Sequence, residues 1–193
     1  NGVTIKAVFT PEHGFKGVAG AGEKVENGIE PLTGAPIFSL YGETKKPTSE
    51  MLMGVDILVF DMQDIGVRYY TYVSTLTLTM EAAAESGIPF MVLDRVNPLG
   101  SDIMGPILDV EFSSFVGMHP IPVRHGMTLG ELAQMINGES WLSYGIMADL
   151  TVIPYDGKIN QEVRESMFYP PPSPNMSNLE TAWLYPVPYT HLT

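Results

Sequence analysis

The sequence has no cysteine and few basic residues, and both shortages exclude classes of function. Without cysteine, the chain forms no disulfide bonds and offers no thiolate ligands to a metal. Only 10 residues are Lys or Arg against 22 Asp or Glu, which gives a net charge of −12. Nucleic acid is therefore not an expected partner, because binding to phosphates needs clustered positive charge. The acidic residues are scattered, so they do not form an interaction tail.

Long apolar runs are also missing. No stretch approaches the roughly 20 apolar residues that span a bilayer, and no signal peptide is visible. The chain begins at Asn1 and looks trimmed, so the compartment stays open on these grounds. Hydrophobic residues nonetheless make up 45% of the 193 residues, which is enough for a packed core in one domain.

Short apolar segments predict the strands of a sheet. VDILVFD (55–61) and IPFMVLD (88–94) are almost continuously apolar, which is typical of strands buried on both faces of a parallel sheet. TIKAVF (4–9), IFSLYG (37–42) and DLTVIP (149–154) are further strand candidates. A glycine-rich loop follows the first of them, and a loop of such length in a compact domain is usually functional.

Helices are predicted between these strands. Residues 68–87 form the longest candidate, and they make 55–94 a strand–helix–strand unit with a right-handed crossover. Residues 127–140 carry a threonine and a glutamate at the spacing of a capping box. A short helix is expected over 46–54, with Thr48 as its N-cap. The pattern predicts an α/β class with a mostly parallel, doubly wound sheet that has helices on both faces.

Polar residues cluster where three of the predicted strands end. In an open α/β sheet, ligands bind beyond the carboxyl ends of the strands, so these residues are candidates for a site. The candidates are Glu12, His13, Asp61, Gln63, Asp64, Asp94, Arg95 and Asn97.

Structural roles compete with functional ones at these positions. An Asp after a strand is often a turn former or a helix cap, which applies to Asp64, and Asp94 could form an ion pair with Arg95. Glu12 is a poor turn or cap residue, so a role in the site is favoured. His13 is a site candidate or a residue that holds a loop carbonyl.

Two further groups are candidates outside the strand ends. His125 precedes the capped helix and either lines the site or holds the helix entry. Tyr69, Tyr70 and Tyr72 open the longest helix, where two of them should face the core and the third could be a platform for a sugar. Tyr70 is included among the substrate-binding candidates, whereas Glu131 is assigned to the capping box alone.

Three reaction classes compete on these residues. A glycosidase needs a protonated acid and a second group beside an oxocarbenium-like centre, for which Glu12 and the neighbouring carboxylates are suited. A metal-dependent hydrolase could use His13, His125, Asp61 and Asp94, although their spacing matches no compact metal motif. A nucleotide-binding loop is disfavoured, because the glycines of GVAGAGEKVENG do not join a strand to a helix. No G-x-S-x-G motif is present, which argues against an ordinary serine hydrolase.

Several blocks of the sequence together resemble one family, long described as DUF1343 or YbbC-like and associated with exo-β-N-acetylmuramidases of the NamZ type. The similarity covers nearly all of residues 5–186. The blocks are FTPEHGFKG, AGEKV, TGAPIFSLYGETKKPTSEML, VDILVFDMQDIGVRYYTYVSTLTLTMEAAAE, VLDRVNPLG, SFVGMHPIPVRHGMTLGELAQMINGE and PPSPNM.

The resemblance implies a Rossmann-like domain over 1–155 whose active cleft faces a smaller C-terminal domain, of which 156–193 would be the start. It implies release of N-acetylmuramic acid from the non-reducing ends of peptidoglycan fragments, with Glu12 as catalytic acid and no cofactor or metal. The expected partner is a muropeptide or disaccharide, and the expected location is extracytoplasmic. The oligomeric state stays open. Arg68 or Arg95 would read the lactyl carboxylate of muramic acid, since a guanidinium binds a carboxylate in a bidentate way.

One position departs from the family pattern. Relatives often carry an acid just before the GP that follows the NPL block, and Met104 stands there in this chain. Asp102, two residues earlier, is the candidate for a second catalytic carboxylate in its place. Because the chain also looks like a fragment, it could lack activity alone, and a peptidoglycan-binding module without catalysis is the alternative reading.

Overall fold

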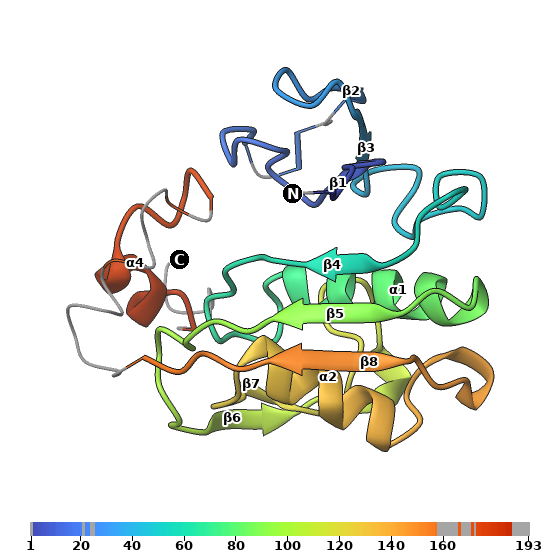
Figure 1. The fold of residues 1–193 in the computed structure, drawn as a ribbon. Helices are drawn as coiled ribbons and strands as arrows, with labels where there is room; N and C mark the ends of the chain where they lie inside the picture. The colour runs from blue at the N-terminus through green and yellow to red at the C-terminus, as the bar shows by residue number, and fades with distance from the viewer. Residues whose placement is uncertain are drawn as a thin grey trace.

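The computed structural model describes residues 2–20, 22–23, 26–157, 166, 171 and 173–186. Within them the chain has an α/β fold built from three small sheets and the helices between them (Figure 1). No helix among these residues has the length and hydrophobicity that a membrane crossing requires.

The central sheet contains three parallel strands in the order β4–β5–β8. They are β4 (Leu58–Phe60), β5 (Phe90–Leu93) and β8 (Leu150–Ile153). All three lie within segments that the apolar pattern predicts as strands, and Phe90 and Val92 of the middle strand are fully buried. The parallel arrangement is therefore confirmed for this part of the chain.

Two helices cover one face of the central sheet. α1 (Tyr72–Glu85) connects β4 to β5, and α2 (Leu129–Gly138) precedes β8. The helices contact each other and both contact β5, and Figure 1 shows them behind the sheet. Their inner faces form the core with side chains such as Leu76, Met80 and Leu132, which are fully buried. Burial of one such side chain contributes about 1.5–3 kcal/mol to folding.

The predicted end of α1 and the predicted start of α2 agree with the structure. Gly87 follows α1 with φ of +65°, a left-handed conformation that glycine adopts without a steric cost. At the start of α2, Thr128 and Glu131 make both hydrogen bonds of a capping box. The predicted start of the helix over 68–87 is wrong, because residues 68–71 precede α1.

The N-terminal strands form a separate sheet. β1 (Val8–Thr10) pairs in parallel with β3 (Pro36–Ser39), which pairs in antiparallel with β2 (Gly28–Ile29). Among the described residues, β1 and β4 are not paired with each other. A cavity of about 1260 Å³ separates the two sheets and is lined by residues of both.

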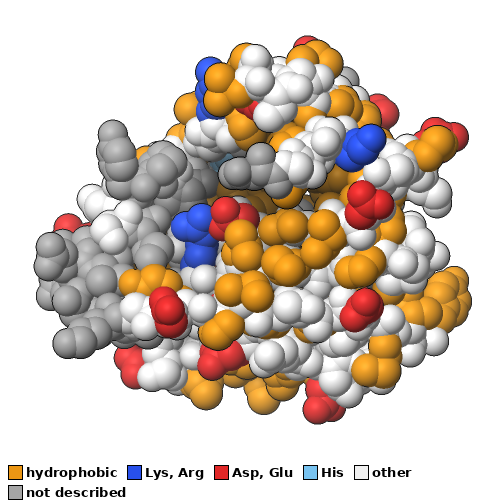
Figure 2. Space-filling model, in the orientation of Figure 1, with side chains coloured by type: hydrophobic (Ala, Val, Ile, Leu, Met, Phe, Trp, Pro, Cys, Tyr) orange, Lys and Arg blue, Asp and Glu red, His pale blue; other side chains and the backbone are white. Residues whose placement is uncertain are grey.

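The uncovered face of the central sheet is apolar. Val59 of β4 is 47% exposed and Ile153 of β8 is 46% exposed, although the sequence pattern predicts β4 to be buried on both faces. Figure 2 shows hydrophobic side chains gathered on this face. Both long helices lie on the opposite face, so the described residues contain no second helical layer over these strands.

Other elements were not expected from the sequence. β6 (Met104–Ile107) and β7 (Pro122–Arg124) form an antiparallel pair with an irregular register. Every residue of β6 is exposed and two of them are Gly and Pro, so no apolar alternation indicates a strand there. Two short 3₁₀ helices, η1 (Val110–Phe112) and η2 (Ser143–Gly145), and the helix α4 (Leu179–Leu184) complete the described elements.

The prediction of a short helix over 46–54 is wrong. The structure has turns there, although the Thr48 hydroxyl accepts a hydrogen bond from the Met51 amide as an N-cap would. Leu52 is buried but Met53 is 77% exposed, so tertiary packing holds too little of this segment to sustain a helix. Most of the proline-rich stretch before residue 173, and most of the region assigned to a second domain, lie outside the described residues.

Candidate active site

Glu12 and His13 lie in a run of tight turns directly after β1. The Gly14 amide donates to the Pro11 carbonyl and the Gly17 amide to the Gly14 carbonyl, so the chain turns twice within a few residues. A small pocket of about 60 Å³ opens beside these turns. Its lining residues are Glu12, His13, Tyr69, Tyr70, Thr71, Ser173, Asn175, Met176 and Tyr185. Among the described residues, Glu12 is the one carboxylate in this lining.

Both carboxylate oxygens of Glu12 accept hydrogen bonds from distant parts of the chain. The Gly22 amide donates to Oε1 over 3.1 Å, and the Thr71 hydroxyl donates to Oε2 over 3.0 Å. The Tyr41 hydroxyl also faces the carboxylate: burial raises the pKa of Tyr41, and a hydrogen bond to Glu12 raises it further. Glu12 itself is half-buried, so these contacts orient its carboxyl group while part of it stays accessible.

His13 is buried and has a φ of +74°, which is uncommon for a residue other than glycine. Its Nδ1 lies 2.8 Å from the Ala19 carbonyl oxygen, which can only accept, so Nδ1 carries a proton. In the neutral ring, Nε2 is then an acceptor. His13 therefore holds a loop carbonyl, as one of the two interpretations expects, and also lines the Glu12 pocket.

Tyr69, Tyr70 and Tyr185 line the pocket, and Tyr72 lies next to Tyr70. Tyr70 and Tyr72 are buried and meet edge to face with their centroids 4.6 Å apart, while Tyr69 is half-buried and donates to the Tyr185 carbonyl. The expectation that two of the three tyrosines face the core is confirmed. Burial raises the pKa of Tyr70 strongly and that of Tyr72 to about 12, so both rings are neutral near pH 7.

Asp61 and Arg95 lie at the larger cavity rather than in the Glu12 pocket. Nε and Nη2 of Arg95 both donate to Oδ1 of Asp61, over 2.8 and 2.6 Å. The side chain of Asp61 is 48% exposed and that of Arg95 is 37% exposed, so the ion pair contributes little to stability. Arg95 therefore pairs with Asp61 and not with its neighbour Asp94.

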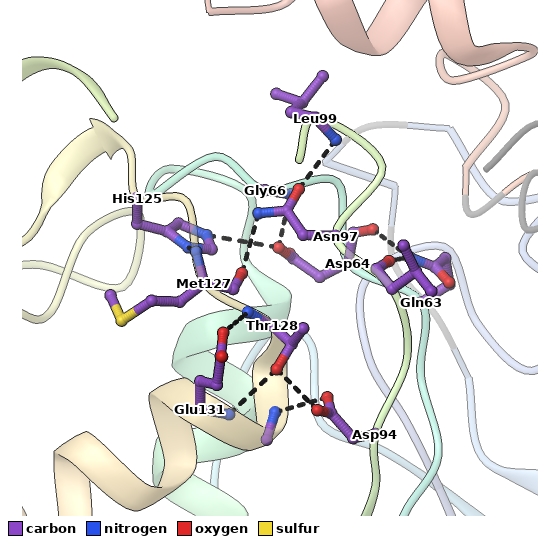
Figure 3. Close-up of polar contacts among 12 residues, drawn as sticks. Gln63, Asp64, Gly66, Asp94, Asn97, Leu99, His125, Met127, Thr128 and Glu131 are labelled. Carbon is purple, nitrogen blue, oxygen red and sulfur yellow. Dashed lines mark hydrogen bonds and ion pairs between the residues drawn. The ribbon is translucent and has the colours of Figure 1, made fainter. Parts of the chain in front are cut away.

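Four candidates form a polar network near the strand ends (Figure 3), in which Asp64, Asn97 and His125 are buried and Gln63 is half-buried. Asp64 accepts from the Gly66 amide two residues later, which is the turn-forming role considered for it. Nδ2 of Asn97 donates to the Met127 carbonyl. The network, defined as Gln63, Asp64, Asn97 and His125, binds mainly backbone groups.

The histidine of this network has an assignable proton. Nδ1 of His125 accepts from the Met127 amide, so Nε2 carries the proton in the neutral ring. Nε2 lies 3.6 Å from Oδ2 of Asp64. His125 is buried, and its bond from the Met127 amide holds the entry to α2, which is one of its two expected roles.

Asp94 anchors the N-terminus of α2 (Figure 3). Its Oδ2 accepts from the Thr128 hydroxyl over 2.7 Å, and its Oδ1 accepts from the Gly130 amide over 2.8 Å and from the Arg95 amide. The ion pair with Arg95 considered for Asp94 is wrong, because Arg95 pairs with Asp61 and Asp94 instead binds the first turn of α2 from another segment of the chain.

Arg68 and Asp102 lie apart from the Glu12 pocket. Nη1 of Arg68 donates to the carbonyls of Pro106 and Ile121 and thereby holds the β6–β7 pair. Asp102 is 72% exposed and lies 3.8 Å from Arg124. Neither residue lines the pocket, so the structure does not bring the candidate second carboxylate beside Glu12.

The described residues contain no group of three or more His, Asp or Glu side chains arranged to hold a metal ion. Of the four ligands considered for a metal-dependent hydrolase, His13 lines the Glu12 pocket, Asp61 pairs with Arg95, and Asp94 binds the start of α2. His125 belongs to the polar network. These four side chains therefore serve different parts of the fold.

Sequence reasoning missed several residues around Glu12. Thr71, Tyr41 and Gly22 contact its carboxylate from three separate segments, and no spacing in the sequence links them. Ser173 and Asn175 also line the pocket. The block PPSPNM, which contributes to the family resemblance, contains both of these residues and was the one available signal for them.

The fold and the pocket define an α/β protein with an acidic residue presented beyond a strand end. The family described as "Exo-beta-N-acetylmuramidase NamZ, N-terminal" matches residues 1–180, so the chain belongs to this family, as the resemblance suggests. The peptidoglycan beta-N-acetylmuramidase NamZ of Bacillus subtilis (strain 168) is 51% identical over 191 residues, which cover 95% of this chain and 44% of that protein. The chain thus spans less than half the length of this relative.

Two crystal structures of DUF1343 family proteins from Bacteroides fragilis NCTC 9343 have the same fold. One superposes with a TM-score of 0.83 at 41% identity and covers 95% of this chain and 46% of its own length. The other gives a TM-score of 0.75 at 38% identity, with 94% of this chain and 55% of that chain covered. The α/β fold is therefore shared within the family.

Proposed function

We propose that this chain carries the catalytic acid of an exo-β-N-acetylmuramidase, which releases terminal N-acetylmuramic acid from the non-reducing ends of peptidoglycan fragments. The observation that carries the proposal is the carboxyl group of Glu12, held by hydrogen bonds at both oxygens in a pocket that tyrosines line. Membership of the family and the name of the Bacillus subtilis relative support the substrate class.

Glu12 is suited to proton transfer to a glycosidic oxygen. A general acid must lie within hydrogen-bond reach of the leaving oxygen, and Glu12 is the carboxylate of the pocket among the described residues. His13 lies beside it with Nε2 available as an acceptor, so it can bind a sugar hydroxyl. The rings of Tyr69 and Tyr185 offer apolar surface against which a sugar ring packs.

The lactyl carboxylate of muramic acid is best matched by Arg95. Arg68 donates to two backbone carbonyls, whereas Arg95 is partly exposed, lines the larger cavity and binds a single oxygen of Asp61. We expect Arg95→Met to lower the preference for muramic acid over N-acetylglucosamine glycosides. If Arg68→Met and Arg95→Met both leave this preference unchanged, neither arginine reads the lactyl group.

The function is tested by release of para-nitrophenol from its β-N-acetylmuramic acid glycoside. The full-length protein is compared with its Glu12→Gln variant, with and without EDTA. Cleavage that survives EDTA and disappears in the variant supports the proposal. Loss of cleavage with EDTA alone would favour a metal-dependent hydrolase.

A peptidoglycan-binding module without catalysis is the second candidate. It is favoured by the position of Asp102, which does not line the pocket, and by the exposed Met104 where relatives often carry an acid. A folded protein that binds muropeptides in calorimetry but releases no product would establish it.

The substrate class also suggests where the protein acts. Peptidoglycan lies outside the cytoplasmic membrane, so we propose an extracytoplasmic location for the protein. Cell fractionation with an antibody against the chain tests this, and recovery of the protein with cytoplasmic markers would contradict it.

A further inference from the structure

Thr71 occupies the N-cap position of α1, but its side chain does not cap the helix. Its backbone has φ of −64° and ψ of −8°, whereas N-cap residues usually have an extended conformation that turns the side chain onto the helix. The hydroxyl instead leaves the helix and donates to Oε2 of Glu12, 59 residues earlier in the chain. We propose that Thr71 is a positioning residue for Glu12, an inference that rests on the proposed function.

The neighbouring threonines of α1 behave differently. Thr75 donates its hydroxyl to the Thr71 carbonyl, and Thr79 donates to the Thr75 carbonyl. Both are buried and their hydroxyl groups satisfy backbone groups within the same helix. Thr71 precedes them at the same spacing of four residues but bonds outside the helix. Its hydroxyl therefore has a use that helix formation does not explain.

Besides Tyr41, two hydrogen-bond partners hold the Glu12 carboxylate, the Gly22 amide and the Thr71 hydroxyl, and these two differ in chemistry. The Gly22 amide can only donate, so it keeps Oε1 in the role of an acceptor. The Thr71 hydroxyl can donate or accept, so it can accompany Oε2 both when the carboxyl group carries a proton and after the proton has left. The pair of contacts thus favours Oε2 as the oxygen that carries and delivers the proton.

Without the Thr71 hydroxyl, the Glu12 carboxylate keeps its hydrogen bonds from the Gly22 amide and the Tyr41 hydroxyl but loses the bond from α1. A carboxyl group displaced by about 1 Å from the leaving oxygen costs on the order of 10²-fold in rate. We therefore expect Thr71→Val to lower kcat about 10- to 100-fold and to leave KM within about twofold. Substrate binding itself should change little, because the methyl group and the shape of the side chain are retained.

The experiment measures kcat and KM of the full-length protein on the para-nitrophenyl β-N-acetylmuramic acid glycoside. Thr71→Val and Thr71→Ala remove the hydroxyl group, Thr71→Ser keeps it, and Thr79→Val is the matched control on the same helix. The proposal expects low kcat in the first two variants, recovery to within about threefold in Thr71→Ser, and normal kcat in Thr79→Val. Thermal unfolding identifies any variant that fails to fold, and Thr71→Ala then replaces Thr71→Val.

The Glu12→Gln variant separates this proposal from the proposed function. If the wild-type protein releases no product, the proposed function fails and the role of Thr71 fails with it. If activity depends on Glu12 but Thr71→Val and Thr71→Ala keep kcat within about threefold of the wild type, only the role of Thr71 is overturned. A rise in KM with unchanged kcat, or no recovery in Thr71→Ser, overturns it as well.

Discussion

Glu12 lies two residues beyond β1 and Asp64 lies four residues beyond β4, and each accepts a hydrogen bond from a glycine amide. The Gly66 amide that binds Asp64 is two residues away, within a buried turn. The Gly22 amide that binds Glu12 is ten residues away and exposed, and Thr71 binds the other oxygen from a different segment. Asp64 therefore shapes its own turn, whereas the surrounding structure places Glu12.

The same difference separates the Glu12 pocket from the polar groups beneath the strand ends. Gln63, Asn97 and His125 bind backbone amides and carbonyls, and Asn97 and His125 are buried. Such groups stabilise a fold because leaving a buried partner unsatisfied costs about 1–3 kcal/mol. Glu12 is half-buried beside an open pocket, which leaves its carboxyl group available to a ligand. A polar residue at a strand end thus indicates function only when local backbone groups do not already bind it.

The largest expected effect is the loss of activity in Glu12→Gln. The amide cannot deliver a proton, so we expect a fall in kcat/KM of about 10³-fold, at the scale of a lost general acid. The free energy of unfolding should change by less than about 0.5 kcal/mol, since Gln retains the size and an acceptor oxygen. Urea denaturation alongside the glycoside assay checks both. A large loss of stability with modest loss of activity would place Glu12 with the structural residues.

Asp94→Ala should show the reverse pattern. It removes a carboxylate that binds the Thr128 hydroxyl and the Gly130 amide, and hydrogen bonds to charged groups are worth about 1.5–3 kcal/mol each. We expect the free energy of unfolding to fall by about 3 kcal/mol, measured in urea. The protein that remains folded should keep its activity. A stable variant with lost activity would return Asp94 to the list of site residues.

The pH dependence of stability tests another buried polar residue, His119. Burial lowers the pKa of His119 to about 4, while the unfolded chain has an ordinary histidine near 6.5. Between these values the unfolded state binds more protons, so stability falls as the pH drops from about 6.5 to about 4 and then levels off for this group. We expect a contribution of about 3 kcal/mol across this window.

The control for this effect is His119→Gln. In His119 the Nε2 atom lies 2.8 Å from the Thr77 hydroxyl, and Gln keeps a hydrogen-bonding group there without a charge near pH 5. Urea midpoints of both proteins are measured from pH 4 to pH 8. The difference in free energy of unfolding between the wild type and His119→Gln should shrink as the pH falls. A constant difference would show that His119 takes up a proton as easily in the folded state as in the unfolded state.

Gly130→Ala should destabilise the protein even though Ala is the better helix former by about 1 kcal/mol. A Cβ atom at Gly130 would lie 2.6 Å from Cγ of Asp94 and 2.7 Å from Cγ1 of Val152, so the contact with Asp94 must open. We expect a net loss of about 1–2 kcal/mol in thermal or urea unfolding. Gly138→Ala is the matched control in the same helix, because nothing lies within 4 Å of a Cβ there. Equal effects at both positions would contradict the close packing of α2 on Asp94.

The smallest effect is expected for the Asp61–Arg95 pair. Asp61→Asn should change the free energy of unfolding by less than about 0.5 kcal/mol, because the pair is exposed and water competes for both partners. Increasing salt concentration should reduce even this difference. A loss above about 1 kcal/mol in urea would show that the pair supports the edge of the central sheet.

Much of the central layer could be predicted from local sequence. The apolar runs 55–61 and 88–94 contain β4 and β5, and the capping box at Thr128 and Glu131 begins α2 as expected. Local sequence did not show that residues 46–54 lack a helix. A short helix is stable only when tertiary packing supports it, and the exposed Met53 does not contribute such packing. The pair of β6 and β7 carries no apolar alternation and was therefore missed.

Part of the candidate site was also predictable. The unusual acid–imidazole pair Glu12 and His13 after β1 indicated the pocket, and the structure places both residues in its lining. The same reasoning gave equal attention to Asp94 and Asn97, which the structure uses to hold backbone groups. The pattern of acids at strand ends does not separate these cases, because the bonding partners come from other segments.

The sequence by itself determined the family, the α/β class and the segment that presents Glu12, because hydrophobic runs, capping spacings and the blocks that resemble the family are properties of neighbouring residues. Only the tertiary structure decided which carboxylates hold a turn or a helix end and which one faces a pocket. It also decided that Thr71, 59 residues from Glu12, holds the second carboxylate oxygen. Hydrogen bonds between distant segments depend on how the chain packs, and no local pattern encodes them.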